Sequence, residues 1–149
     1  MRRGIVFVLG LLVLAGCTGT AAEPAAPPQT LAGRNVARTE FGRLSGSDFG
    51  GAWDIWSPGA QRVIDRADFV ALNTQCRPAI GQPYVITGVV GDSATRITVH
   101  WRTGQRTGTD DVAYQGNRWR FVPGADEQAD YRLGVAALVA RRRAAGQCR

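Results

Sequence analysis

The sequence predicts an α+β fold in which helices come first, four antiparallel strands follow and one helix ends the chain. Up to about residue 76, apolar residues recur at helical spacing behind residues that cap helices well. From Tyr84 the period changes to two, which is typical of a sheet with one wet face. Helices that cover the apolar face of such a sheet form the usual layered arrangement, and 149 residues suffice for one domain.

Capping residues predict the helices before the sheet. Thr30 is the expected N-cap of a helix over residues 31–44, and Asp48 is the expected cap of a second that ends near Pro58. Pro58 is well placed to open another turn, and Asp65 caps a helix that reaches residue 76. The apolar face of the first helix is expected to hold Leu31, Val36, Phe41 and Leu44.

Four strands are expected at residues 84–90, 95–102, 112–114 and 119–121, the last two joined by a tight turn at Gly116-Asn117. In the second strand His100 alternates away from the apolar face, so we expect it to face water. We interpret Asp110 and Asp111 as turn residues with solvated charge. A single closing helix begins at Ala125, and its apolar stripe comprises Tyr131, Val135, Leu138 and Val139.

The first seventeen residues predict export. Arg2 and Arg3 precede an apolar run over residues 5–14, which is too short to cross a membrane and is typical of a signal peptide. The run ends in Leu14-Ala15-Gly16-Cys17, which resembles the bacterial lipobox. The resemblance implies a signal peptide over residues 1–16 and a diacylglyceryl group on Cys17. An ordinary secretory signal with a chance cysteine is the alternative.

The segment after Cys17 is rich in Ala and Pro and could not build a core, so residues 17–29 are expected to be a tether. The folded domain would then occupy residues 30–149, held at the extracytoplasmic face of the cell membrane by its lipid anchor. All 18 cationic residues are arginine, and removal of Arg2 and Arg3 leaves 16 against 12 acidic residues, a net charge of +4. This mild, scattered charge argues against a nucleic-acid partner.

Two further cysteines, Cys76 and Cys148, are expected to form a disulfide outside the cytoplasm. Free buried thiols are the alternative. Metal binding is disfavoured because a structural zinc site needs four ligands and the chain has a single histidine. We expect no metal and no cofactor.

Two segments carry a resemblance to a known superfamily. Trp53-Asp54-Ile55-Trp56-Ser57-Pro58 after a helix, followed by a sheet that ends in Asn117-Arg118-Trp119-Arg120-Phe121, resembles the NTF2-like, cystatin-related domains that include ketosteroid-isomerase-like proteins. The resemblance covers residues 31–122 and implies helices packed into a bent sheet to form a cone. The final helix departs from that pattern. More narrowly, the chain resembles small lipoproteins of high-GC bacteria that carry such a domain.

A cone of this kind is where isomerase and dehydratase relatives do their chemistry, but we identify no catalytic residue. His100 is expected on the wet face, and fold alone is a weak argument for activity. Tryptophan and tyrosine most often belong to the core, although they can also line a ligand cavity. The residues that could line one are Trp53, Trp56, Tyr84, Val99, Trp101, Tyr114, Trp119 and Phe121.

The sequence therefore predicts a membrane-anchored lipoprotein with a non-catalytic accessory or binding domain. Its partner would be an envelope protein or an apolar small molecule. The alternative is a small-molecule isomerase or dehydratase. An inward-facing acid or histidine in an open cone would favour the enzyme, and a cone filled by Trp and Leu would favour the binding role.

Overall fold

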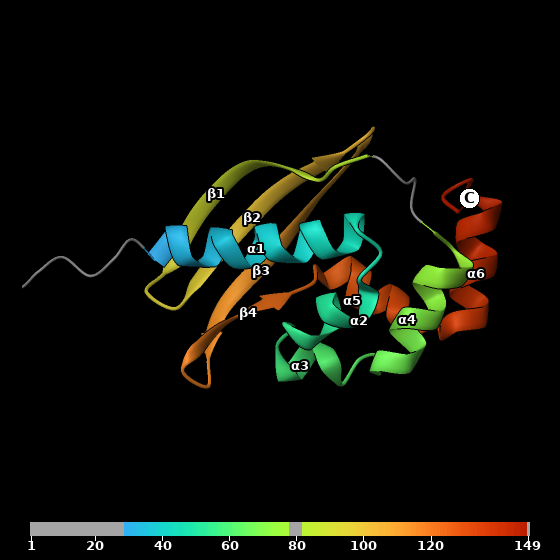
Figure 1. Ribbon diagram of the computed structural model, residues 1–149, viewed down its shortest axis with the longest axis horizontal. Coiled ribbons are helices and arrows are strands. Elements are labelled where there is room, and N and C mark those ends of the chain that lie inside the picture. The colour runs from blue at the N-terminus through green and yellow to red at the C-terminus, as the bar shows by residue number, and fades with distance from the viewer. Residues whose placement is uncertain (1–28, 78–81, 149) are drawn as a thin grey trace, which may run out of the picture.

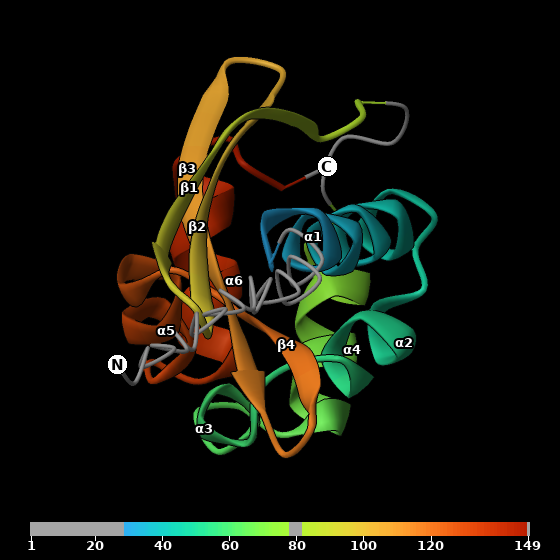
Figure 2. The same cartoon turned by 90° about the vertical axis from the view of Figure 1, so that its left-hand side faces the viewer.

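The computed structural model describes residues 29–77 and 82–148, and it confirms an α+β fold with a four-stranded antiparallel sheet (Figure 1). The export signal and the lipidation site lie outside the described residues. Helices lie on both sides of the sheet, which is seen edge-on in Figure 2. No helix within the described ranges is long and apolar enough to cross a membrane. The elements are α1 (Gln29–Ser45), α2 (Phe49–Asp54), α3 (Pro58–Gln61), α4 (Arg66–Gln75), β1 (Val85–Ser93), β2 (Arg96–Thr103), β3 (Arg106–Gln115), β4 (Arg118–Val122), α5 (Ala125–Tyr131) and α6 (Val135–Ala144).

The sheet is a meander in the order β1-β2-β3-β4, with one dry face. Ile97, Val99 and Trp101 of β2 are buried, as their alternation predicts, and lie opposite Val112, Asp110 and Gly108 of β3. His100 lies on the other face and is exposed, with Nδ1 3.2 Å from the hydroxyl of Thr109. Its predicted exposure is therefore confirmed.

Helix α1 covers the dry face with a stripe different from the one expected. Its buried residues are Gly33, Ala37, Glu40 and Phe41, whereas Leu31 is 55% exposed. Gly33 faces the side chain of Ile97 so closely that a Cβ atom there would overlap it. Small residues thus let the helix approach the sheet, and this contact decides which face is buried. Thr30 is not the N-cap, because α1 already includes Gln29.

The expected caps of the next helices are confirmed. The Asp48 carboxylate accepts the Gly51 N–H at 2.9 Å, and the Asp65 carboxylate accepts the Asp68 N–H at 2.8 Å. Between α2 and α3, the chain runs beside β4 and extends the sheet edge. Ser57 N–H donates to Phe121 O at 2.8 Å, and Phe121 N–H donates to Ile55 O at 3.0 Å.

Two predictions for the C-terminal half are wrong. The single closing helix is two helices, separated at Gly134, whose φ of 78° ends the helical path. The third strand begins at Arg106 and not at residue 112, so Asp110 lies within β3 and is 4% exposed. The acidic pair that resembled a turn therefore places one carboxyl inside the domain and the other, on Asp111, in an ion pair with Arg96.

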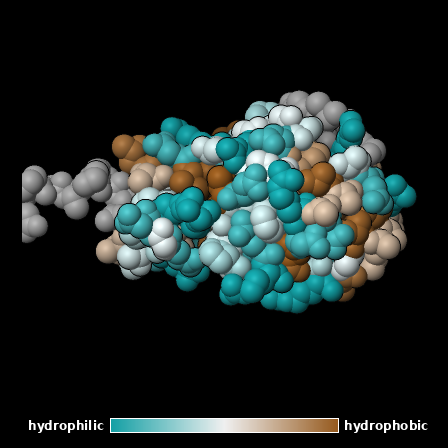
Figure 3. Space-filling view, turned by 60° about the horizontal axis from the view of Figure 1, so that its bottom comes forward, coloured by the Kyte–Doolittle hydropathy of each residue, from teal (hydrophilic) through white to brown (hydrophobic). Residues whose placement is uncertain are grey.

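A disulfide joins Cys76, just after α4, to Cys148, beyond α6, with their Cα atoms 4.6 Å apart. Helix α6 packs on α4 and buries Leu138 and Val139. The C-terminal segment is thereby part of the domain. Hydrophobic atoms on the face shown in Figure 3 are scattered among hydrophilic ones and form no single broad apolar surface there.

Candidate functional site

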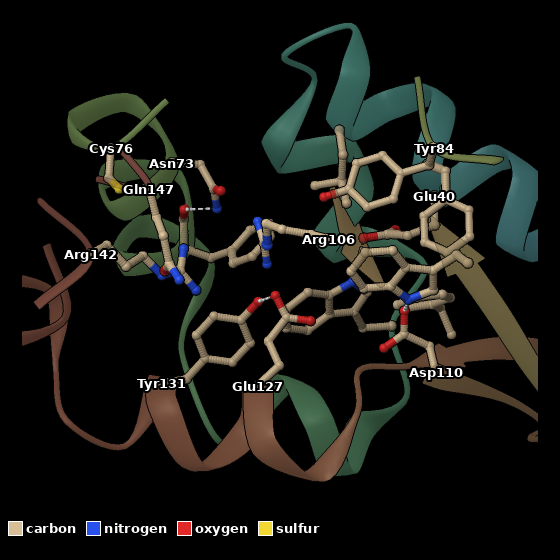
Figure 4. Close-up of a pocket in the computed structure, with 16 residues that line it drawn as sticks. Glu40, Asn73, Cys76, Tyr84, Arg106, Asp110, Glu127, Tyr131, Arg142 and Gln147 are labelled. Carbon is tan, nitrogen blue, oxygen red and sulfur yellow. Dashed lines mark hydrogen bonds between the residues drawn. The ribbon is translucent and has the colours of Figure 1, made fainter. Parts of the chain in front are cut away.

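An interior cavity of about 50 Å³ lies where the dry face of the sheet meets α1, α4 and α5 (Figure 4). Ligand pockets for drug-sized molecules usually measure about 300–1,000 Å³, so this cavity suits only a few non-hydrogen atoms or waters. It is lined by Glu40, Phe41, Leu44, Trp56, Phe69, Asn73, Cys76, Tyr84, Trp101, Arg106, Asp110, Phe121, Glu127, Tyr131, Arg142 and Gln147.

Glu40 is the most enclosed polar residue of the cavity. It occupies a position that the helical period of α1 would reserve for an apolar residue, three residues after Ala37, and it is fully buried. Trp56 Nε1 donates to Glu40 Oε1 at 3.0 Å, whereas Oε2 has no partner among the described residues. Burial raises the pKa of Glu40 from 4.5 to about 8, and the carboxyls of Glu127 and Asp110 add to the increase.

Asp110 faces the cavity from β3, and each of its carboxylate oxygens accepts a hydrogen bond. Trp101 Nε1 donates to Oδ2 at 2.5 Å, and the Gly124 N–H donates to Oδ1 at 2.7 Å. The Trp101 ring can reach Asp110 because Gly108, its cross-strand neighbour, has no side chain in the way. Burial raises the pKa of the Asp110 carboxyl, the charge of Glu127 adds to the increase, and the two N–H donors oppose it.

A third carboxyl comes from α5. Glu127 accepts the hydroxyl of Tyr131 at 2.6 Å, and burial raises the pKa of that phenol well above its usual value. Tyr84, from the chain before β1, stacks on Phe41 with ring centroids 4.8 Å apart. Burial likewise raises the pKa of Tyr84 to about 12, so both phenols keep their protons at neutral pH.

Aromatic rings fill most of the remaining wall. The rings of Tyr84 and Trp101 meet edge to face with their centroids 5.1 Å apart. The centroid of the Trp56 ring lies 4.6 Å from that of Phe69 and 5.7 Å from that of Tyr131. Carboxyls in such surroundings are poorly solvated, which explains why desolvation is the largest cause of each shift.

The cavity continues into a wider, open groove along β3 and α5. Six residues line both spaces, namely Trp101, Arg106, Asp110, Glu127, Arg142 and Gln147. Figure 4 shows Glu40 and Asp110 at one end, Arg142 and Gln147 at the other, and Arg106 between them. Neither Arg106 nor Arg142 takes part in an ion pair within the described part of the chain. The cavity is therefore acidic inside, and at its opening Arg106 and Arg142 stand among the acidic residues of the groove.

Of the residues predicted to line a cavity, Trp56, Tyr84, Trp101 and Phe121 come together here. Val99 is buried in the core beneath α1 but does not border the cavity. The remaining three lie elsewhere. Trp53 donates its indole N–H to Ile64 O at 3.0 Å, and Tyr114 packs on Trp119 at the β3–β4 hairpin.

None of the three carboxyls was predicted as a site residue. Glu40 carried a usable signal, because it shares the helical face of Gly33, Ala37 and Phe41. Asp110 carried one too, since it alternates with Val112 once the strand is extended backwards. For Glu127 we find no comparable signal in the pattern of its neighbours.

The arrangement can accept hydrogen bonds from a small ligand or exchange protons near neutral pH. In the described ranges, no group of three or more His, Cys, Asp or Glu residues is placed to hold a metal ion. Compared with known proteins, the chain matches no family model and none of the curated sequences.

Proposed function

We propose that the chain is a bacterial lipoprotein, anchored through Cys17 at the extracytoplasmic face of the membrane, whose domain binds a small ligand without transforming it. The lipobox-like Leu14-Ala15-Gly16-Cys17 supports the anchor, and the disulfide agrees with an oxidising compartment. The NTF2-like cone is part of the proposal, supported by helices packed on the dry face of an antiparallel sheet.

The observation that carries the binding role is the unpaired Oε2 of Glu40 at the inner end of the cavity. A buried polar atom without a partner is costly, and such atoms are rare in folded proteins. A ligand that pairs with Oε2 would remove this cost. The small volume of about 50 Å³ and the close aromatic packing favour holding a ligand over rearranging one.

The alternative is an isomerase or dehydratase that works by acid–base chemistry in the cavity. Two observations favour it. Glu40 and Asp110 border the cavity from within, as the enzyme would require, and the pKa of Glu40 lies near neutrality, where a general acid or base is most effective. The exposed position of His100 argues against a histidine–carboxylate pair.

The two functions differ in the fate of the ligand. Protein purified from membranes would be screened against small amines, acids and alcohols by thermal shift, and each hit would be recovered after long incubation and analysed by NMR. Stabilisation by a ligand that is returned unchanged, and that Trp56→Phe weakens, supports binding. Conversion of the hit, abolished in Glu40→Gln, would establish the enzyme. A screen without stabilising molecules would contradict the ligand-binding role.

A further inference from the structure

We propose that the cavity binds a short zwitterion, with a primary ammonium group at the inner carboxyls and an anionic group at the entrance arginines. This inference rests on the proposed ligand-binding function and names the chemistry of the ligand.

The inner end of the cavity is rich in carboxyls. Glu40, Asp110 and Glu127 all border it, and the charge of Glu127 helps to raise the pKa of both Glu40 and Asp110. Glu40 has an unpartnered, fully buried oxygen directed into this space. The chain contains no lysine, so an ammonium group at this position would have to come from a ligand. An ammonium brings three donors and a compact charge, which suits several acceptors around a small space.

The aromatic wall of the cavity also favours an ammonium group. Trp56 and Trp101 border the cavity and donate to Glu40 and Asp110, while Tyr131 donates to Glu127. Aromatic faces attract ammonium groups, most strongly where water is excluded. A carboxylate ligand would instead meet like charges at this end.

The opposite end carries two arginines, in a groove whose wall also holds five acidic residues. Arg142 of α6 and Arg106 of β3 border both the cavity and the outer groove, and the described residues supply no carboxylate in ion-pair contact with either. Guanidinium groups bind carboxylates and phosphates with paired donors. A molecule with both charges would therefore align in a single direction, ammonium inward.

Size restricts the part of the ligand that enters the cavity. The inner space of about 50 Å³ holds the ammonium end and a few carbons, and the groove of about 720 Å³ outside it has room for the anionic end beside the arginines. Two sources share this chemistry, a free ω-amino acid and the phosphoethanolamine headgroup of a lipid.

Calorimetric titration of the mature lipoprotein in detergent micelles near pH 8 tests the inference. The probes are 4-aminobutyrate, O-phosphoethanolamine, butylamine and butyrate. We expect the two zwitterions to bind more tightly than butylamine, and butyrate not to bind. Glu40→Gln should weaken all ammonium ligands at least about tenfold, since it removes a charge-assisted hydrogen bond. Arg142→Gln should weaken the zwitterions and leave butylamine unchanged, and the exposed Arg132→Gln serves as the matched control.

The outcomes separate this inference from the proposed function. Binding of butyrate, or binding of the ammonium probes that Glu40→Gln does not weaken, would overturn the ammonium assignment and leave a ligand-binding domain. No heat with any probe at millimolar concentration overturns the assignment as well. If O-phosphoethanolamine binds more tightly, and nanodiscs of phosphatidylethanolamine compete with it but nanodiscs of phosphatidylglycerol do not, the source is the lipid headgroup. Preference for 4-aminobutyrate identifies a free amino acid instead. Because Glu40→Gln could alter folding, its unfolding temperature is measured alongside.

Discussion

Replacement of Glu40 by glutamine should stabilise the ligand-free protein at neutral pH. The amide keeps the shape of the side chain, and its carbonyl can still accept the indole N–H of Trp56. It removes a carboxyl that is fully buried and whose pKa is raised from 4.5 to about 8. A group whose pKa is higher in the folded than in the unfolded state makes the protein less stable as pH rises between the two values.

The loss of stability follows from the interval between the pKa of Glu40 in the unfolded chain and its pKa in the folded protein. Between pH 4.5 and pH 7 the unfolded chain releases the Glu40 proton while the folded protein retains it, which costs about 3 kcal/mol of stability. The loss approaches about 5 kcal/mol above pH 8, where both states are ionised. Glu40→Gln lacks this loss, so the difference between the two proteins should grow from near zero at about pH 4 to several kcal/mol at about pH 8.5.

Urea unfolding of the disulfide-intact proteins at several pH values measures this difference. The exposed Asp126→Asn serves as the control and should shift every point by the same small amount. Parallel pH curves for wild type and Glu40→Gln would refute the reasoning, because Glu40 would then already be ionised and satisfied in the folded protein. A functional site often holds such a destabilising group, and stability gained at the expense of ligand binding would agree with that.

Three further predictions concern packing and anchorage. Gly33→Ala should destabilise the domain by about 1–3 kcal/mol because its Cβ overlaps Ile97, whereas the Cβ of Gly42→Ala in the same helix meets no other atom and should stabilise the domain by up to about 1 kcal/mol. Urea unfolding measures both variants, and equal effects would contradict the close approach of α1 to the sheet. Cys148→Ser should lower stability by about 4 kcal/mol, as expected for a bridge across 72 residues, and an unchanged melting temperature would count against a structural role. Cys17→Ala should leave the chain unprocessed or release it from membranes, as followed by fractionation and mass spectrometry; normal processing and retention would refute the lipid anchor.

Local physical chemistry made much of the fold predictable. The caps at Asp48 and Asp65 depend on a side chain three residues from the N–H that it accepts, so the sequence contains the whole interaction. The hairpin turn was predictable for the same reason, because Asn117 tolerates the positive φ of 63° that it adopts. The break at Gly134 was not, since an isolated glycine is also compatible with an uninterrupted helix.

The candidate site depends on distant contacts and was only partly predictable. Apolar character indicated Trp56 and Trp101 as interior residues, but not that each would donate its indole N–H to a buried carboxyl. A glutamate in a helix and an aspartate pair near a glycine are typical of solvated positions. Only the packing of α1 on the sheet, set by Gly33 against Ile97, brings Glu40 to the interior.

The most direct test of the ligand cavity uses the indole N–H groups as reporters. Those of Trp56 and Trp101 donate to Glu40 and Asp110, while that of Trp53 donates to the backbone of Ile64, away from the cavity. Two-dimensional ¹H–¹⁵N NMR spectra of the mature protein would be recorded during addition of 4-aminobutyrate. The account predicts saturable shifts of the Trp56 and Trp101 signals and an unmoved Trp53 signal. Unchanged signals for Trp56 and Trp101, or equal shifts of all the indole signals, would contradict a ligand site at the buried carboxyls.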